Sequence, residues 1–247
     1  MTVSSTVVKN PSLIAGTPSG KHPTKVREHR RAATTAGALY IIGTVSGLLS
    51  VALLAPTRDA AELLASASTN QGAVVTGAIV VLVMGLSLAL IPVVLYPVLR
   101  AVNETLAVGY LVIRGAVETT CYVLSAVGLL VFASLGGGTA GSDGVAAWLG
   151  DALVNAEAPN TVLALVFCMG ATLFYIALYS SRIVPRWISV WGLAAIPVYV
   201  TAALLAAYGA VEPASSGQML LFIPLALQEM VLAVWMIARG FRPVAKS

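Results

Sequence analysis

The sequence predicts an all-α protein of the membrane, a bundle of six transmembrane helices with both termini in the cytoplasm. Hydrophobic residues make up 58% of the 247 positions and charged residues only 10%, whereas a soluble domain carries charge on about a quarter of its positions. A soluble fold with so few charges could not cover itself with polar surface. Six apolar segments also reach the length of about 20 residues that a helix needs to cross a bilayer. Lipid is therefore the expected solvent.

The six predicted spans cover most of the chain after a polar beginning. They lie at 33–55, 72–99, 106–135, 161–180, 188–208 and 219–237. Together they form one predicted transmembrane domain over 33–241. Residues 1–32 are mostly polar, so we expect a disordered basic tail on the cytoplasmic side. The first apolar run exceeds the 7–15 residues of a signal peptide core and is predicted to stay uncleaved.

The placement of Lys and Arg predicts the orientation. Twelve of the 14 basic residues lie in the tail, in the 100–105 and 181–187 turns and after residue 237. The alternate connections, 56–71, 136–160 and 209–218, hold one basic residue, Arg58, and six acids. Because positive charge stays on the cytoplasmic side of membrane proteins, both termini are expected there.

Within the first two segments, two features predict local packing. Gly43 and Gly47 in the first span form a small-xxx-small motif, which permits close helix approach. It would serve packing within the chain or, as an alternative, a homodimer. Pro92 and Pro97 in the second span remove helix hydrogen bonds and predict a bend.

The 136–160 connection is long enough to hold a short helix. Over 145–154 its apolar residues, Trp148 among them, repeat at helical spacing. A helix with one apolar face that carries a Trp suits the lipid–water boundary. A lid over a substrate path is the alternative interpretation of the same segment.

The third and sixth segments carry the ionisable residues of the spans, Arg114, Glu118 and Glu229. Insertion of an Asp, Lys or Arg into a span costs roughly 2.5–3.5 kcal/mol, and ionisable residues within spans are candidates for function. In a regular helix, Tyr110, Arg114, Glu118, Cys121 and Ser125 would lie on one stripe. Arg114 and Glu229 both lie about 13 Å from the cytoplasmic end of their spans. We therefore predict that Arg114 pairs with Glu118 or Glu229, with Gln228 as a hydrogen-bonding neighbour and Tyr110 nearby.

Two interpretations of this buried polar network stay open. A structural ion pair would fix the register of two helices. A proton or anion site would use two acids that share one Arg, so that one acid is free to carry a proton.

Other chemistry finds little support in the spans. Both histidines, His22 and His29, lie in the tail, so a histidine metal site in the bundle is not expected. No span holds a Lys or an Asp, which excludes a Ser–Lys dyad and a pair of catalytic aspartates. No phosphate-binding loop is present. We expect no catalytic residues, no metal and no cofactor.

Basic and aromatic residues beside the spans are expected to anchor the protein at the lipid interface. A basic cluster directly precedes the first span, where it favours anionic lipid rather than nucleic acid. Trp and Arg beside other spans are typical interfacial residues. The predicted anchors are Lys25, Arg27, Arg30, Arg31, Arg182, Arg186, Trp187 and Trp148.

Several blocks of the sequence stand out when taken together: 95–99 (Leu-Tyr-Pro-Val-Leu), Asn103-Glu104, Gly109-Tyr110, Arg114, 178–192 with its Val-Pro-Arg-Trp core, 224–230 with Leu-Gln-Glu-Met, and 233–235 (Ala-Val-Trp). In this order they resemble a bacterial membrane-protein family, domain of unknown function 4386. The resemblance runs from about residue 32 to 242. It implies six spans and a bacterial cytoplasmic membrane, and no activity. One departure is that the family often places its acid three residues after the Arg, whereas Glu118 stands four after Arg114.

Three function classes follow in order of support. The first is a membrane scaffold or accessory component with a structural Arg/Glu network. The second is a small-solute or proton-linked transporter that uses Arg114, Glu118 and Glu229. The third is an intramembrane enzyme. A polar cavity that reaches the acids would favour transport, and a dry, tightly packed pair would favour the scaffold.

Overall fold

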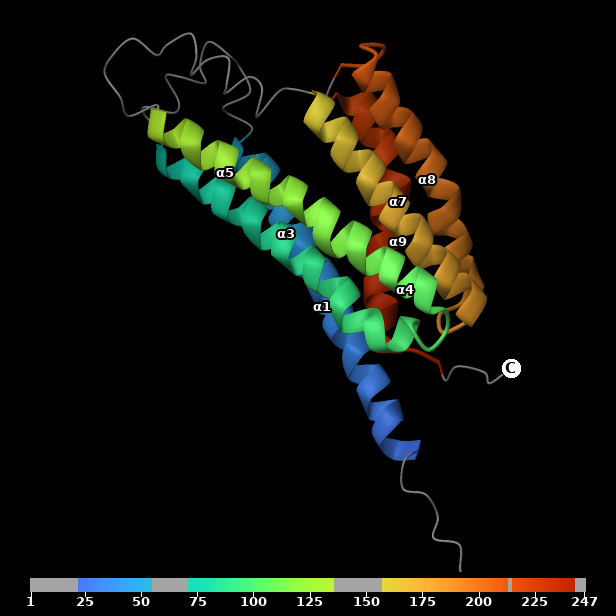
Figure 1. The fold of residues 1–247 in the computed structure, drawn as a ribbon. Coiled ribbons are helices and arrows are strands. Elements are labelled where there is room, and N and C mark those ends of the chain that lie inside the picture. Colours follow the sequence, from blue (N-terminus) through green and yellow to red (C-terminus); the bar gives the residue numbers. More distant parts are fainter. Residues whose placement is uncertain (1–21, 55–70, 136–156, 213–214, 243–247) are drawn as a thin grey trace, which may run out of the picture.

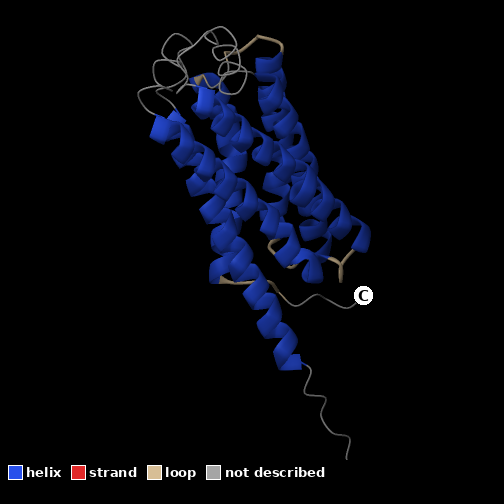
Figure 2. Ribbon diagram, turned by 60° about the vertical axis from the view of Figure 1, so that its left-hand side comes forward, coloured by secondary structure: helices blue, strands red, loops and turns tan. Residues whose placement is uncertain are grey.

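The computed structural model describes residues 22–54, 71–135, 157–212 and 215–242. These residues form helices and no strand (Figures 1 and 2). Six of the continuous helical stretches are long and apolar enough to cross a membrane. The prediction of an all-α bundle with six spans is therefore confirmed.

The observed spans lie close to the predicted segments. The third span is one continuous helix in three parts, named α4, η2 and α5. The elements in chain order are α1 (His22–Leu54), α3 (Gln71–Leu99), α4 (Glu104–Tyr110), η2 (Leu111–Glu118), α5 (Thr119–Leu135), α7 (Glu157–Ser181), α8 (Arg186–Ala207) and α9 (Ser216–Ala238).

The start of α1 differs from the prediction, which placed the end of a disordered tail at residue 32. Instead α1 begins at His22. Pro23 stands in the first turn, where its missing N–H costs nothing. The Arg, Glu and Ala residues that follow are strong helix formers. The helix therefore extends from the apolar segment into polar sequence.

Each span packs against its neighbours in chain order, and α9 closes the ring on α1. We call α1, α3 and the third span the first arm, and α7, α8 and α9 the second arm. The third span reaches α7 through α4 and η2. In Figure 1 the arms lie together at the lower end, where both chain ends leave the bundle, and they diverge toward the upper end.

Buried apolar residues fall into two clusters that match this shape. One cluster draws on all six spans and includes Tyr40, Leu95, Phe174 and Leu232, so it joins the two arms. The other lies inside the first arm, between α3 and α5. Small residues bring the arms close: a Cβ at Gly37 would lie 2.7 Å from the backbone oxygen of Ala233 in α9.

The small-xxx-small motif of α1 packs within the chain. A Cβ at Gly43 would lie 2.8 Å from Leu88, and a Cβ at Gly47 would lie 2.9 Å from the sulfur of Met84. Both partners belong to α3. Packing within the chain, the first of the two predicted uses of this motif, is therefore present, and a homodimer through Gly43 and Gly47 stays a prediction.

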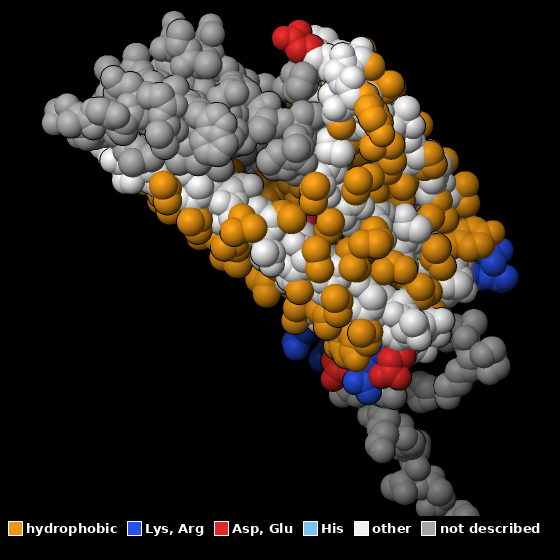
Figure 3. All heavy atoms as spheres, turned by 45° about the horizontal axis from the view of Figure 1, so that its top comes forward, with side chains coloured by type: hydrophobic (Ala, Val, Ile, Leu, Met, Phe, Trp, Pro, Cys, Tyr) orange, Lys and Arg blue, Asp and Glu red, His pale blue; other side chains and the backbone are white. Residues whose placement is uncertain are grey.

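The outer surface of the spans is apolar. Leu48, Leu124 and Leu220 are 64–69% exposed, and hydrophobic side chains spread over the face drawn in Figure 3. Apolar side chains face outward in this way when lipid is the solvent.

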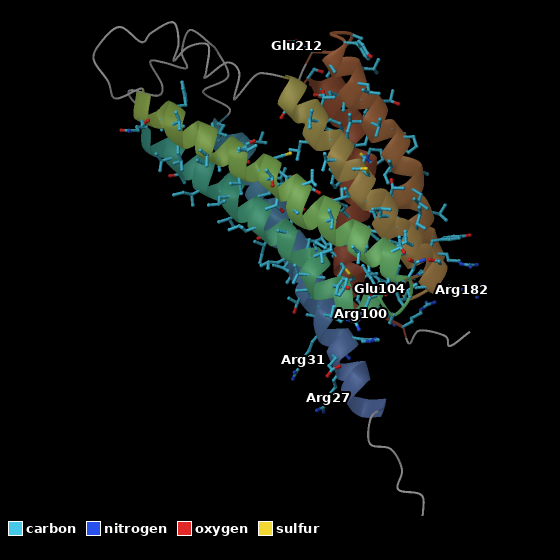
Figure 4. All side chains as sticks on the ribbon, in the orientation of Figure 1. Arg27, Arg31, Arg100, Glu104, Arg182 and Glu212 are labelled. Carbon is cyan, nitrogen blue, oxygen red and sulfur yellow. The ribbon has the colours of Figure 1, made fainter. Side chains whose placement is uncertain are left out.

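Charged residues gather at the two ends. Figure 4 places Arg27, Arg31, Arg100 and Arg182 at the lower end and Glu212 at the opposite end. Glu104 also lies at the lower end, beside Arg100. Most of the predicted acidic connections, 55–70 and 136–156, fall outside the described residues.

Most predicted interface anchors lie at the surface of the lower end. Arg27, Arg30, Arg31, Arg182, Arg186 and Trp187 are exposed. The Arg186 guanidinium lies over the Tyr179 ring, 4.8 Å from its centre. Lys25 lies within α1. Trp148 and the predicted 145–154 helix fall outside the described residues.

Candidate functional site

The middle of the third span is a π-helix, which changes the register of its side chains. η2 covers Leu111–Glu118 and holds both Arg114 and Glu118. π-Helical turns are rare and are frequently found at functional sites. The hydroxyl of Thr119 donates to the backbone oxygen of Arg114 at 3.2 Å. Gly115 faces Pro92 of α3, since a Cβ there would lie 3.4 Å from the proline ring.

The wider turn moves the buried stripe by about one position. Tyr110, Arg114 and Glu118 are buried as predicted. The prediction that Cys121 and Ser125 continue this stripe is wrong, because both are only half-buried. Beyond Glu118 the buried positions are Ala126, Leu129, Phe132 and Ala133. A regular α-helix would not have produced this shift.

Arg114 lies at the centre of the bundle and contacts both acids. Its side chain is 1% exposed; Nη1 lies 3.5 Å from Glu118 Oε2 and Nη2 lies 3.6 Å from Glu229 Oε1. The sequence predicted a pair with one acid or the other, and the structure has both. These contacts are longer than a charge-assisted hydrogen bond of about 2.7–2.9 Å. The three groups therefore interact mainly through their charges.

Aromatic rings enclose the guanidinium. The carbon at its centre lies 5.0 Å from the Phe167 ring centre and 5.5 Å from that of Tyr40. Both distances fit cation–π attraction. The hydroxyls of Tyr40 and Tyr110 lie 3.5 Å apart, and Tyr110 stacks on Phe174. Tyr110 thus supports Tyr40 rather than Arg114 itself.

The two acids have different surroundings. Glu118 shares the first arm with Arg114, its side chain is 1% exposed, and it accepts a hydrogen bond of 3.4 Å from Tyr122. Glu229 belongs to the second arm and its side chain is 14% exposed. The side chain of Glu118 is therefore fully buried, whereas the side chain of Glu229 remains partly accessible.

A pocket of about 190 Å³ adjoins Glu229. Thr44 contributes to it from the first arm, and the other lining residues belong to the second arm. Phe222 precedes Glu229 by two helical turns, so the pocket extends about 10 Å from the acid toward the end at which the arms diverge. Its lining is Thr44, Phe167, Tyr199, Phe222, Leu225, Ala226 and Glu229.

Gln228 does not join the charged network, so the prediction that it neighbours Arg114 is wrong. It accepts a hydrogen bond of 2.6 Å from the hydroxyl of Tyr175 and donates one of 3.0 Å to the backbone oxygen of Ile188. Successive helical side chains point about 100° apart. Gln228 therefore faces α7 and α8, where it holds the second arm together.

Sequence reasoning missed the aromatic members of the site. Tyr40, Tyr122, Phe167, Tyr199 and Phe222 all lie within apolar segments, where aromatic rings suit the core and the lipid face equally. Tyr122 stands four residues after Glu118, and that spacing was the one signal available. Within the described residues, no three His, Cys, Asp or Glu side chains come together as metal ligands.

A family model described as a domain of unknown function (DUF4386) matches residues 35–240. No curated protein and no solved structure matches the chain.

Proposed function

Because the chain belongs to the DUF4386 family of unknown function, we propose its function from the site itself: a proton-linked membrane carrier of a small solute, in which Glu229 takes up the proton. One observation carries the proposal. Glu229 is paired with an Arg of the opposite arm and at the same time lines the pocket.

The charge of the network supports proton uptake. One guanidinium faces two carboxylates, which leaves one negative charge uncompensated when both acids are ionised. A buried, uncompensated charge is costly. Glu229 is the acid with an open side, so a proton from the pocket can reach it. The proton bonds to a carboxylate oxygen and the network becomes neutral.

The position of the ion pair supports a conformational response. The Arg114–Glu229 contact joins the two arms, whereas the Arg114–Glu118 contact lies within the first arm. When Glu229 is protonated, Arg114 keeps Glu118 as its charged partner and the attraction between the arms weakens. Buried charges of this kind mark proton relays in pumps and transporters.

The proposal includes a location and an orientation. The carrier lies in a bacterial cytoplasmic membrane, with its basic end and both termini in the cytoplasm. The basic residues at one end and the acidic Glu212 at the other support this orientation. The exposed arginines of that end would contact anionic lipid. No chemical conversion of the solute is proposed.

The test is charge movement in liposomes that contain the purified full chain, adsorbed on a solid-supported membrane. We expect a drop in pH to produce a transient current in the wild type and none in Glu229→Gln. Glu104→Gln removes an exposed carboxylate outside this network and serves as the matched control, with a wild-type current. A current that survives in Glu229→Gln would contradict the proposal, as would a wild-type signal equal to that of empty liposomes.

A structural scaffold is the second candidate, supported by the buried Glu118 and by Gln228, which is hydrogen-bonded to α7 and α8. Under that function the ion pair only fixes the arms. Glu229→Gln would then reduce the yield of folded protein, and the wild type would carry no pH-driven current.

A further inference from the structure

The pocket beside Glu229 is lined largely by aromatic rings. Three aromatic rings follow one another along it. The ring centres of Phe167 and Tyr199 are 5.3 Å apart. Tyr199 and Phe222 stack with their centres 4.1 Å apart and 24° between their planes, so each of these two rings keeps one face free of the other. Glu229 contributes the one charged group of the lining. A carboxylate beside aromatic faces is the chemistry with which proteins recognise ammonium ligands.

The charge balance favours a cation at this place when Glu229 is ionised. Arg114 is already shared between two acids, and it does not line the pocket. The other arginines that the structure describes belong to the polar sequence at the basic end or to the turns. A monovalent cation next to Glu229 would restore neutrality, as a proton does.

The lining favours an organic cation over a metal ion. Calcium requires six to eight oxygen ligands, and the side chains of this lining offer oxygen only from Thr44, Tyr199 and Glu229. The remaining surface is aromatic and aliphatic, which suits the methyl or methylene groups of an alkylammonium. The Phe167 ring already holds one organic cation, the guanidinium of Arg114.

The size of the pocket limits the ligand. A volume of about 190 Å³ lies below the 300–1,000 Å³ of pockets for drug-sized ligands. It therefore fits a compact ammonium compound of a few heavy atoms.

We infer that the pocket binds a small organic ammonium ion, with Glu229 as its counter-ion and the rings of Tyr199 and Phe222 against its alkyl groups. This inference rests on the proposed carrier function and names its substrate class. Ammonium ion and proton would compete for the same carboxylate, so binding of one releases the other.

The test uses radiolabelled choline as the probe, with the purified full chain in detergent. Its neutral isostere, 3,3-dimethylbutan-1-ol, is the competitor. We expect choline to bind and the alcohol to compete at least about tenfold more weakly than unlabelled choline, since a neutral group gains no cation–π attraction. Binding should weaken as the pH falls, because protons then occupy Glu229. Equal competition by the alcohol would overturn the inference.

Ring variants provide a second readout that does not depend on the buried charge. Phe222→Leu and Tyr199→Leu keep an apolar, though smaller, side chain and remove the ring face, so each should weaken choline binding about fivefold. Tyr199→Phe keeps the ring and should bind like the wild type. Unchanged binding in both leucine variants would contradict the inference even if Glu229→Gln failed to fold.

Failure of this inference can be distinguished from failure of the carrier proposal. If the pH-driven current depends on Glu229 but choline does not bind, only the substrate class is wrong. If choline binds with the expected dependence on ring and charge but no current is found, the site stands and the transport proposal is wrong.

Discussion

Arg114 can remain charged in the middle of the bundle because several partners share the cost of removing it from water. The carboxylates of Glu118 and Glu229 lie 3.5 and 3.6 Å from its guanidinium nitrogens. Two aromatic rings lie within cation–π range. Such a network can add little net stability, yet the loss of one member leaves the others buried and unpaired. The residues of the site therefore depend strongly on one another.

Replacement of Arg114 with Met should reduce the free energy of unfolding by about 3–5 kcal/mol, because it leaves Glu118 and Glu229 without a cation. Thermal unfolding of the detergent-solubilised chain measures the loss. Arg100→Met removes an exposed Arg in the turn after α3 and is the matched control. It should change stability by no more than about 0.5 kcal/mol. Equal stability of the two variants would mean that Arg114 does not hold the network.

Glu118→Gln should shift the pH dependence of charge movement to lower pH. In the wild type, Glu118 and Glu229 compete for Arg114, and the charge of Glu118 favours protonation of Glu229. Without that charge, Glu229 has Arg114 to itself and keeps its own charge longer as the pH falls. The current recorded over a series of pH jumps gives the midpoint. A midpoint that stays unchanged, or that moves to higher pH, would show that the two acids are not coupled through Arg114.

At the scale of the elements, hydropathy located the spans because lipid requires about 20 apolar residues in each. The beginning of α1 was missed because polar residues with high helix propensity extended the helix beyond the apolar run. The π-helix was missed because hydropathy does not report helix type. This π-helical segment, η2, decides which residues after Glu118 are buried.

The site was predicted only in part for a similar reason. Arg114, Glu118 and Glu229 stood out because charge is rare in a span. Tyr40, Phe167 and Phe222 did not, because an aromatic residue is ordinary in apolar sequence. Gln228 was misplaced because its neighbour in the chain, Glu229, faces a different side of the same helix.

Close packing of α8 on α7 should be sensitive to a single methyl group. A Cβ at Gly192 would lie 2.6 Å from the ring of Tyr175, whose hydroxyl bonds to Gln228. Gly192→Ala should therefore cost about 1–3 kcal/mol by overpacking, measured by thermal unfolding. Gly72→Ala meets no atom within 4 Å and should not lower stability. A stable Gly192→Ala variant would mean that the second arm is looser than described.

For the whole molecule, the proposed orientation in the membrane predicts which residues can be labelled from outside the cell. Tyr208, 86% exposed, lies toward the Glu212 end, and Arg182 lies at the opposite end. In a chain with Cys121 and Cys168 changed to Ala, Tyr208→Cys in intact bacterial cells should react with a membrane-impermeant maleimide. Arg182→Cys should react only after the cells are opened. The reverse pattern would invert the proposed topology.

The central claim concerns the two arms of the molecule: protonation of Glu229 releases them from each other. Val127 in α5 and Val162 in α7 are both about half exposed (51% and 54%), and they belong to different arms. Spin labels there, on the chain without its native cysteines, would report the separation of the arms in lipid nanodiscs by pulsed electron resonance.

The distance distribution between these labels should change when the pH is lowered from about 8 to about 5. Glu229→Gln, which cannot carry the negative charge, should show the low-pH distribution at both values. Distributions that are the same at both pH values in the wild type, or a wild-type pH response that persists in Glu229→Gln, would contradict the claim.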